Sequence, residues 1–272
     1  MNLSKKFVFV GALASVVLLA GCQSGTAEPY LNATIAGHYQ DFYTNGPTDP
    51  DAAMRALDAA EQADRKNAYT LYLRATAEAG AKKYAEALQT MQAAHALPNV
   101  THYVATPPPD DDMATLGRIR QLGYTTRDAK ALGDDAAMYC RNVRKVGARV
   151  AKAQPITSLG ALAGIAVIRN SYENELKLKL SPEAEQSLKA ERAKFDAWTT
   201  TFNDGLKSTL KNMMQEAGKA AGLTDAELVQ YAKGERLANA EKQRKADEAR
   251  AKLYDAEVAE ITRLLETMPE IR

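Results

Sequence analysis

The sequence predicts an all-α protein. Apolar residues past Tyr30 recur at spacings of three and four, and Ala, Leu, Glu, Lys and Arg, which favour helices, are abundant. No segment shows the alternating β-branched residues that indicate strands. With 272 residues, 46% of them hydrophobic, the chain can bury one large core or two small ones. A formal net charge of +1 provides no overall basic field, so we expect no nucleic-acid partner.

The N-terminus has the pattern of an export signal. Two lysines at positions 5 and 6 precede an apolar run from Phe7 to Ala20, which is too short to cross a bilayer stably. The run ends in the tetrapeptide Leu19-Ala20-Gly21-Cys22. This tetrapeptide resembles the lipobox of bacterial lipoproteins, with leucine first, two small residues next and cysteine last.

The resemblance implies that residues 1–21 are a lipoprotein signal peptide and that Cys22 becomes the first mature residue. It also implies a diacylglycerol group on the Cys22 thiol and an acyl chain such as palmitate on the freed amine. Three acyl chains hold a protein at a membrane far more firmly than one. Gln23 follows the cysteine where an aspartate would signal retention, so the family pattern implies the Gram-negative outer membrane. We expect the protein to face the periplasm there.

Residues 22–30 would then form a short lipidated tether of small and polar residues. Its small and polar part, from Gln23 to Pro29, reaches at most about 25 Å, since an extended chain spans ~3.5 Å per residue. We therefore expect the folded part to lie close to the membrane. The alternative interpretation is an ordinary cleaved secretory signal in which the cysteine is incidental.

Residues 31–104 show a weak internal repeat with an offset of 34 positions. The offset and the small residues resemble the tetratricopeptide repeat, a helical hairpin whose small side chains allow close helix packing. The resemblance places repeat-packing positions at Ala53, Leu57, Ala60, Ala75, Tyr84, Ala87, Met91 and Ala94. It is incomplete, because Asp41 and Pro50 stand where the first copy needs a small and an aromatic residue. The alternative is an unrelated antiparallel pair of alanine-rich helices.

Residues 105–112 form a Pro/Asp-rich linker, because Pro107-Pro108-Pro109 cannot continue a helix. The aspartates that follow lack the alternate spacing of a calcium loop and suit a helix N-terminus. Residues 113–272 are predicted to form a helical bundle. Its first helices should span Met113–Gln121 and Asp128–Ala153, the second with one apolar side.

The apolar segment from Leu159 to Ile168 predicts a buried central helix in which Gly160 and Gly164 allow close approach. Contact with a partner or with a membrane is the alternative for this segment. A long helix should then begin at Pro182 and end near Gly222. The sequence Thr224-Asp225-Ala226-Glu227 is a capping box that should open one last long helix. Together they predict a long C-terminal antiparallel hairpin.

No motif of a known catalytic or metal site occurs, so we expect a non-enzymatic protein without a metal and without a cofactor other than the lipid on Cys22. The histidines are His38, His95 and His102, and we expect structural or solvent-facing roles for them. For His95, near the end of a predicted helix, a cation would suit the helix dipole. Cys140 lies on the apolar side of its helix, which favours a buried inert thiol over a reactive one or an intermolecular disulfide.

One segment is clearly basic. Between Met113 and Ala153 there are nine basic and three acidic side chains. Four of the basic residues recur at helical spacing and form a candidate binding stripe: Arg141, Lys145, Arg149 and Lys152. Such a stripe could bind anionic cell-wall polymer, lipid head groups or an acidic partner, or could simply be a solvated helix face.

These observations favour a lipid-anchored periplasmic adaptor of the Gram-negative outer membrane, binding protein partners of an envelope, secretion or pilus complex. The alternatives are an envelope enzyme that acts on peptidoglycan and a surface-exposed binding lipoprotein. Peptidoglycan is also a candidate partner for the adaptor itself. A concave groove lined by Tyr69 and Tyr72 would favour peptide docking, whereas a closed cleft with clustered acids would favour an enzyme.

Overall fold

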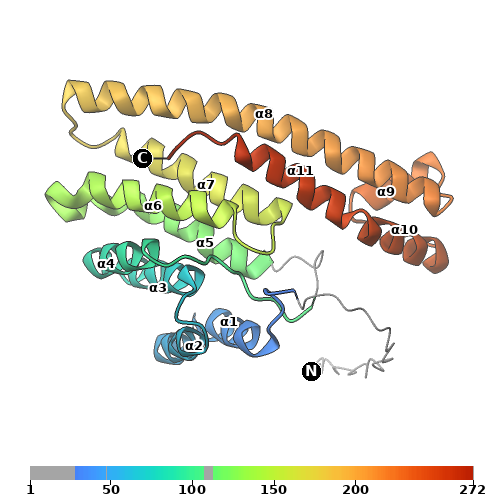
Figure 1. Cartoon of the computed structure of the whole chain (residues 1–272), viewed down its shortest axis with the longest axis horizontal. Coiled ribbons are helices and arrows are strands. Elements are labelled where there is room, and N and C mark those ends of the chain that lie inside the picture. The colour runs from blue at the N-terminus through green and yellow to red at the C-terminus, as the bar shows by residue number, and fades with distance from the viewer. Residues whose placement is uncertain (1–27, 47, 107–112, 272) are drawn as a thin grey trace, which may run out of the picture.

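The computed structural model describes residues 28–46, 48–106 and 113–271. The lipobox with Cys22, most of the tether and the linker prolines and aspartates lie outside the described residues. Within them the fold is all-α, as the sequence predicts, and has no strand beyond isolated bridges. Figure 1 shows the N-terminal helices on one side of the molecule and the longest helix, α8, on the opposite side.

The N-terminal region consists of two successive helix pairs. The first pair is α1 (Ala33–Asn45) with α2 (Pro50–Ala63), and the second is α3 (Ala68–Gly80) with α4 (Tyr84–His95). Side chains of Asn32, Asp49 and Asn67 accept hydrogen bonds from backbone amides in the first turns of α1, α2 and α3. These caps fix where the helices begin.

Seven of the eight predicted repeat-packing residues are buried in the core of this region: Ala53, Leu57, Ala60, Ala75, Ala87, Met91 and Ala94. Tyr84 differs, because it is only half-buried. Its hydroxyl donates to Asp128 at 3.3 Å and its ring meets Tyr139 edge-on at 5.9 Å. Tyr84 therefore joins the helix pairs to the bundle rather than filling an aromatic position between repeats.

An extended segment, residues 99–104, connects the N-terminal region to the rest of the molecule. It forms isolated bridges to Leu31, Asn67 and Gln154. The buried Asn67 side chain holds the segment in place, since it donates to the Thr101 carbonyl at 2.8 Å and accepts from the Thr101 amide at 2.9 Å. Because Asn67 also caps α3, one side chain positions both elements.

The bundle begins with α5 (Met113–Thr125), the 3₁₀ helix η1 (Thr126–Asp135) and α6 (Ala136–Ala151). The prediction of one continuous helix over residues 128–153 was wrong at its start. Residues 126–135 are 3₁₀, and Gly133 has a φ of 55°, which an α-helix cannot accommodate. The predicted apolar side of α6 is confirmed, since these residues are buried: Ala136, Tyr139, Cys140, Val143, Val146, Gly147 and Val150.

The helix predicted from Leu159 is α7 (Ser158–Glu175), which packs most closely on α6. The two backbones meet at Gly147 and Gly164. A Cβ on Gly147 would lie 2.7 Å from the Gly164 carbonyl oxygen, and a Cβ on Gly164 would meet the Gly147 carbonyl more closely still. Gly164 therefore serves close packing inside the molecule, whereas Gly160 faces only the side chain of its N-cap Thr157.

The C-terminal region is built on α8 (Pro182–Ala220), whose 39 residues run the length of the molecule (Figure 1). The chain returns antiparallel to α8, but the prediction of a single returning helix was wrong. The return consists of α9 (Asp225–Ala232), α10 (Ala240–Lys252) and α11 (Tyr254–Glu266). Gly234 with a φ of 74° ends the first piece, and Asn239 caps the next.

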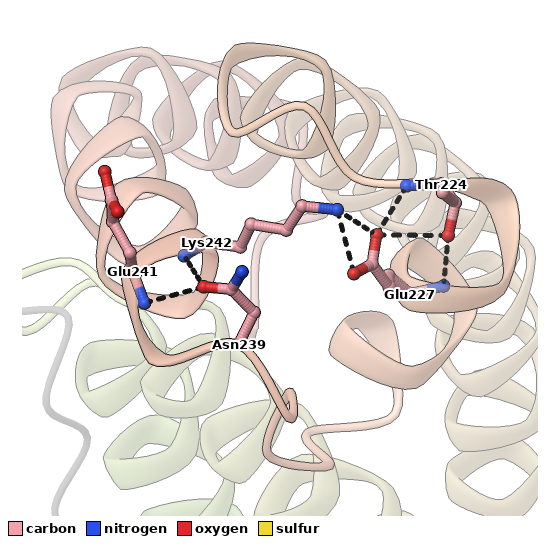
Figure 2. A network of polar contacts seen from close by, with 5 residues as sticks. All are labelled: Thr224, Glu227, Asn239, Glu241 and Lys242. Carbon is pink, nitrogen blue, oxygen red and sulfur yellow. Dashed lines mark hydrogen bonds and ion pairs between the residues drawn. The ribbon is translucent and has the colours of Figure 1, made fainter.

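The predicted capping box is confirmed at the start of α9. Thr224 and Glu227 exchange side-chain and backbone hydrogen bonds, at 2.8 Å and 3.3 Å. Figure 2 shows Lys242 reaching from the first turn of α10 to the Glu227 carboxylate, at 2.7 Å. Ammonium and backbone donors together lower the pKa of Glu227 to about 2. The same carboxylate thus closes one helix end and joins α9 to α10.

No helix in the described ranges has the length and hydropathy needed to cross a membrane.

Candidate binding groove

The predicted basic stripe lies on α6, but its members have different surroundings. Arg141 is about half exposed, and its guanidinium lies 3.6 Å from the Glu175 carboxylate of α7. Lys145 and Lys152 are exposed. Arg149 is half-buried. The four residues therefore do not form a uniform solvated face.

Arg149 is a structural cation. Its guanidinium donates to the carbonyl oxygens of Ala94 and Leu97 at 2.9 Å and 2.5 Å and to the Tyr72 hydroxyl at 2.9 Å. These carbonyls lie at the C-terminal end of α4, where a positive charge complements the helix dipole. Arg149 thus joins α6 to the N-terminal region, and its donors are directed at the protein itself.

His95 does not supply the cation that we expected at this helix end. Burial and the charges of Arg149 and Lys145 lower the pKa of His95 to about 4, so the ring is neutral near pH 7. Its Nδ1 lies 3.1 Å from the Tyr72 hydroxyl, whose oxygen accepts from Arg149. The hydroxyl proton is therefore available to His95, and Arg149 is the cation that complements the dipole of α4.

A buried ion pair that was not predicted from the sequence lies next to the stripe. Arg144 and Glu175 are both almost fully buried and bonded to each other, and the Arg144 guanidinium lies 4.4 Å from the centre of the Tyr172 ring. The burial of Arg144 could have been predicted from the helical spacing. Arg144 stands four positions after Cys140 and three before Gly147, so it lies within the apolar side of its helix. Its partner on α7 could not be inferred from the spacing.

A groove of about 740 Å³ lies where α6, the end of α4 and the C-terminal segment meet. The face of α6 that lines it has the helical spacing i, i+3, i+4, i+7. The lining residues are Lys145, Ala148, Arg149 and Lys152 of α6, Gln154, His95 and Pro98–Thr101, and Met268–Ile271. Three cationic side chains and one carboxylate, that of Glu270, therefore line the groove.

Lys145 and Lys152 are the two cations of the groove whose side chains do not bond to other residues of the groove. Neither ammonium group forms an ion pair or a hydrogen bond with any residue in the part of the chain that the structure describes. In the opposite wall, Met268 and Ile271 pack against the hydrophobic core. The residues just before this wall are held by α8, since Trp198 donates to the Leu264 carbonyl at 3.3 Å and to the Thr267 hydroxyl at 3.1 Å. The groove is thus a preformed basic surface.

The Tyr69 and Tyr72 groove that would have favoured peptide docking is absent from the described residues. Tyr69 and Tyr72 are 1% and 0% exposed. His102 of the extended segment stacks on Tyr69 at 5.0 Å, and Arg149 covers Tyr72. The extended segment and α6 occupy the surface that a peptide would need.

Cys140 has the surroundings of an inert thiol. Cys140 is fully buried, and burial raises the pKa of its thiol to about 12, as expected of an unreactive cysteine. Among the described residues no three His, Cys, Asp or Glu side chains gather as metal ligands would. His38 is half-exposed on α1.

No protein-family model matches the sequence, and no curated protein and no solved structure is significantly similar to the chain.

Proposed function

We propose that the protein is a lipid-anchored periplasmic adaptor of the Gram-negative outer membrane, which binds a protein partner of an envelope, secretion or pilus complex. The lipobox resemblance at Leu19-Ala20-Gly21-Cys22 supports the anchor and the compartment. Acyl chains on Cys22 insert into the outer membrane, and the short tether keeps the folded part near its surface.

The observation that carries the binding role is the basic groove, and within it the pair Lys145 and Lys152. Both are exposed and neither is ion-paired with a described residue, while the neighbouring cations Arg149 and Arg144 are bound within the protein. The groove keeps a net positive charge, because its three cations outnumber the single Glu270 carboxylate. This charge attracts an anionic partner, and the half-buried apolar walls give that partner apolar surface to bury.

The test is capture of partners by the intact lipoprotein from detergent-solubilised envelopes, with identification by mass spectrometry. A Cys22→Ala variant tests the anchor, and a Lys145→Glu/Lys152→Glu variant tests the groove. The matched control is Lys207→Glu/Lys211→Glu, which changes the same charge on the exposed face of α8.

We expect one envelope protein to be captured by the unchanged chain and by the α8 variant and to be lost from the groove variant. The Cys22→Ala chain should no longer fractionate with the outer membrane. Capture of bulk lipoprotein or cell wall alone, or capture that is insensitive to the groove variant, would contradict the adaptor function.

A further inference from the structure

We infer that the ligand of the groove is an extended peptide segment with two carboxylates three residues apart and apolar residues between them. The inference rests on the proposed function, and it specifies the chemistry of the partner.

The spacing of the two groove lysines matches that of an extended peptide. Lys145 and Lys152 are seven residues apart on α6, which corresponds to about 10 Å along the helix axis. A peptide in the extended polyproline-II conformation covers about 9 Å in three residues, and its three residues per turn bring the fourth side chain back to the same side as the first. An acidic residue at each end of such a segment can therefore approach one of the two ammonium groups.

The surface between the lysines is apolar in part, and polar residues such as Gln154 and Glu270 also line it. Ala148 lies between them on α6, and Val100, Met268 and Ile271 line the groove around it. All four are half-buried, which leaves part of their apolar surface open to a ligand. Small apolar side chains of a peptide would bury this surface, at a gain that grows with the apolar area covered.

The apolar walls also select among anions. A glycan or a phosphate-bearing head group would place hydroxyl or phosphate oxygens against the aliphatic walls, where they would lose hydration without gaining partners. The third cation of the groove provides little compensation, because the Arg149 guanidinium already directs three of its five N–H donors at Tyr72, Ala94 and Leu97. Charge at the two ends and apolar surface between them favour an acidic peptide.

The experiment measures the fluorescence anisotropy of a labelled peptide, Asp-Val-Ala-Asp flanked by Gly and Ser, with the full mature lipoprotein in neutral detergent micelles. The same peptide with Asn in place of both Asp residues, and one with adjacent Asp residues, are the ligand controls. Protein variants are Lys145→Gln/Lys152→Gln in the groove and Lys207→Gln/Lys211→Gln on α8, each with its thermal melting curve recorded.

We expect binding that weakens at least about tenfold with the Asn peptide and with the groove variant, and that weakens as salt is added. The α8 variant should bind like the unchanged chain. Equal binding of the Asp and Asn peptides, or competition by purified peptidoglycan or anionic lipid vesicles but not by unlabelled Asp peptide, would overturn the inference. Groove-dependent capture of an envelope protein that lacks such a segment would refute the peptide class and leave the adaptor function standing.

Discussion

The guanidinium of Arg149 donates a hydrogen bond to the Tyr72 hydroxyl at 2.9 Å, joining helices whose bonded residues lie 77 positions apart in the sequence. The same group donates to two carbonyls at the end of α4. Arg149 is therefore the main polar connection between the N-terminal helix pairs and the bundle at the groove.

This connection should contribute measurably to stability. Replacing Arg149 with Met should lower the free energy of unfolding by about 2–3 kcal/mol, because charge-assisted bonds are lost and their acceptors lie partly buried. Tyr72→Phe, which removes the hydrogen bonds of this hydroxyl with Arg149 and with His95, should cost about 1–2 kcal/mol. Urea unfolding measures both, with Arg141→Met as the control. An Arg149→Met variant no less stable than the Arg141→Met variant would disprove the structural role of Arg149.

The crossing of α6 and α7 should not tolerate a side chain at its centre. Gly147→Ala should destabilise the protein by about 3 kcal/mol, since its Cβ would lie 2.7 Å from the Gly164 carbonyl oxygen and the helices would have to separate. Gly37→Ala in α1 meets nothing within 4 Å and should stabilise by about 0.5–1 kcal/mol. Thermal unfolding followed by circular dichroism compares the two. Similar melting temperatures for both variants would show that the close approach is not required.

The buried pair of Arg144 and Glu175 should be sensitive to loss of one partner. Glu175→Gln removes the carboxylate that pairs with the buried Arg144 guanidinium and should cost about 3–5 kcal/mol. Glu173→Gln, two residues earlier on the same helix, breaks an exposed pair with Lys177 and should cost about 0.5 kcal/mol or less. Denaturant unfolding measures the loss of unfolding free energy in both variants. Equal losses for Glu175→Gln and Glu173→Gln would contradict this prediction.

His95 should make stability depend on pH. Its pKa is about 6.5 in the unfolded chain and about 4 in the folded one, so the unfolded state binds more protons between these values. The contribution of His95 to the free energy of unfolding is therefore fully present above about pH 6.5, and it is lost as the pH falls to about 4. Allowing for the partial exposure of the ring, the loss should be about 2 kcal/mol.

The measurement for His95 is the free energy of unfolding at pH 7.0, 5.5 and 4.5 for the unchanged chain and for His95→Gln. Only the difference between the two chains reports on His95, because burial raises the pKa of Glu78 and Glu257 and these groups respond with the opposite sign. Parallel pH profiles would mean that His95 does not titrate as described.

Local patterns in the sequence were sufficient to predict several features of the fold. The all-α class, the apolar side of α6 and the capping box at Thr224 all follow from side-chain periodicity or from a motif of four residues. The breaks in the predicted helices did not follow from them. Gly133 and Gly234 end or interrupt helices through positive φ angles, and helical periodicity continues in the sequence past both of them.

The candidate groove was only half predictable. The spacing of the four cations on α6 identified the correct helix face, because that spacing is a local property. Which of them are available to a partner depends on Leu97, Tyr72 and Glu175, which are distant in sequence and are brought close only by the fold. For the same reason the burial of Tyr72 could not be foreseen, since Arg149 covers its ring.

The most direct measurement is photo-crosslinking in living cells, with a photoreactive amino acid at Ala148 in the groove and, as the control, at Lys207 on α8. If the groove is the docking surface of a lipid-anchored adaptor, Ala148 will form a discrete adduct with one envelope protein. That adduct will be absent at position 207 and will disappear when Cys22 is replaced or when Lys145 and Lys152 are changed to Glu. An adduct at position 207 but not at 148, or no protein adduct at 148 in correctly lipidated chain, would contradict the account.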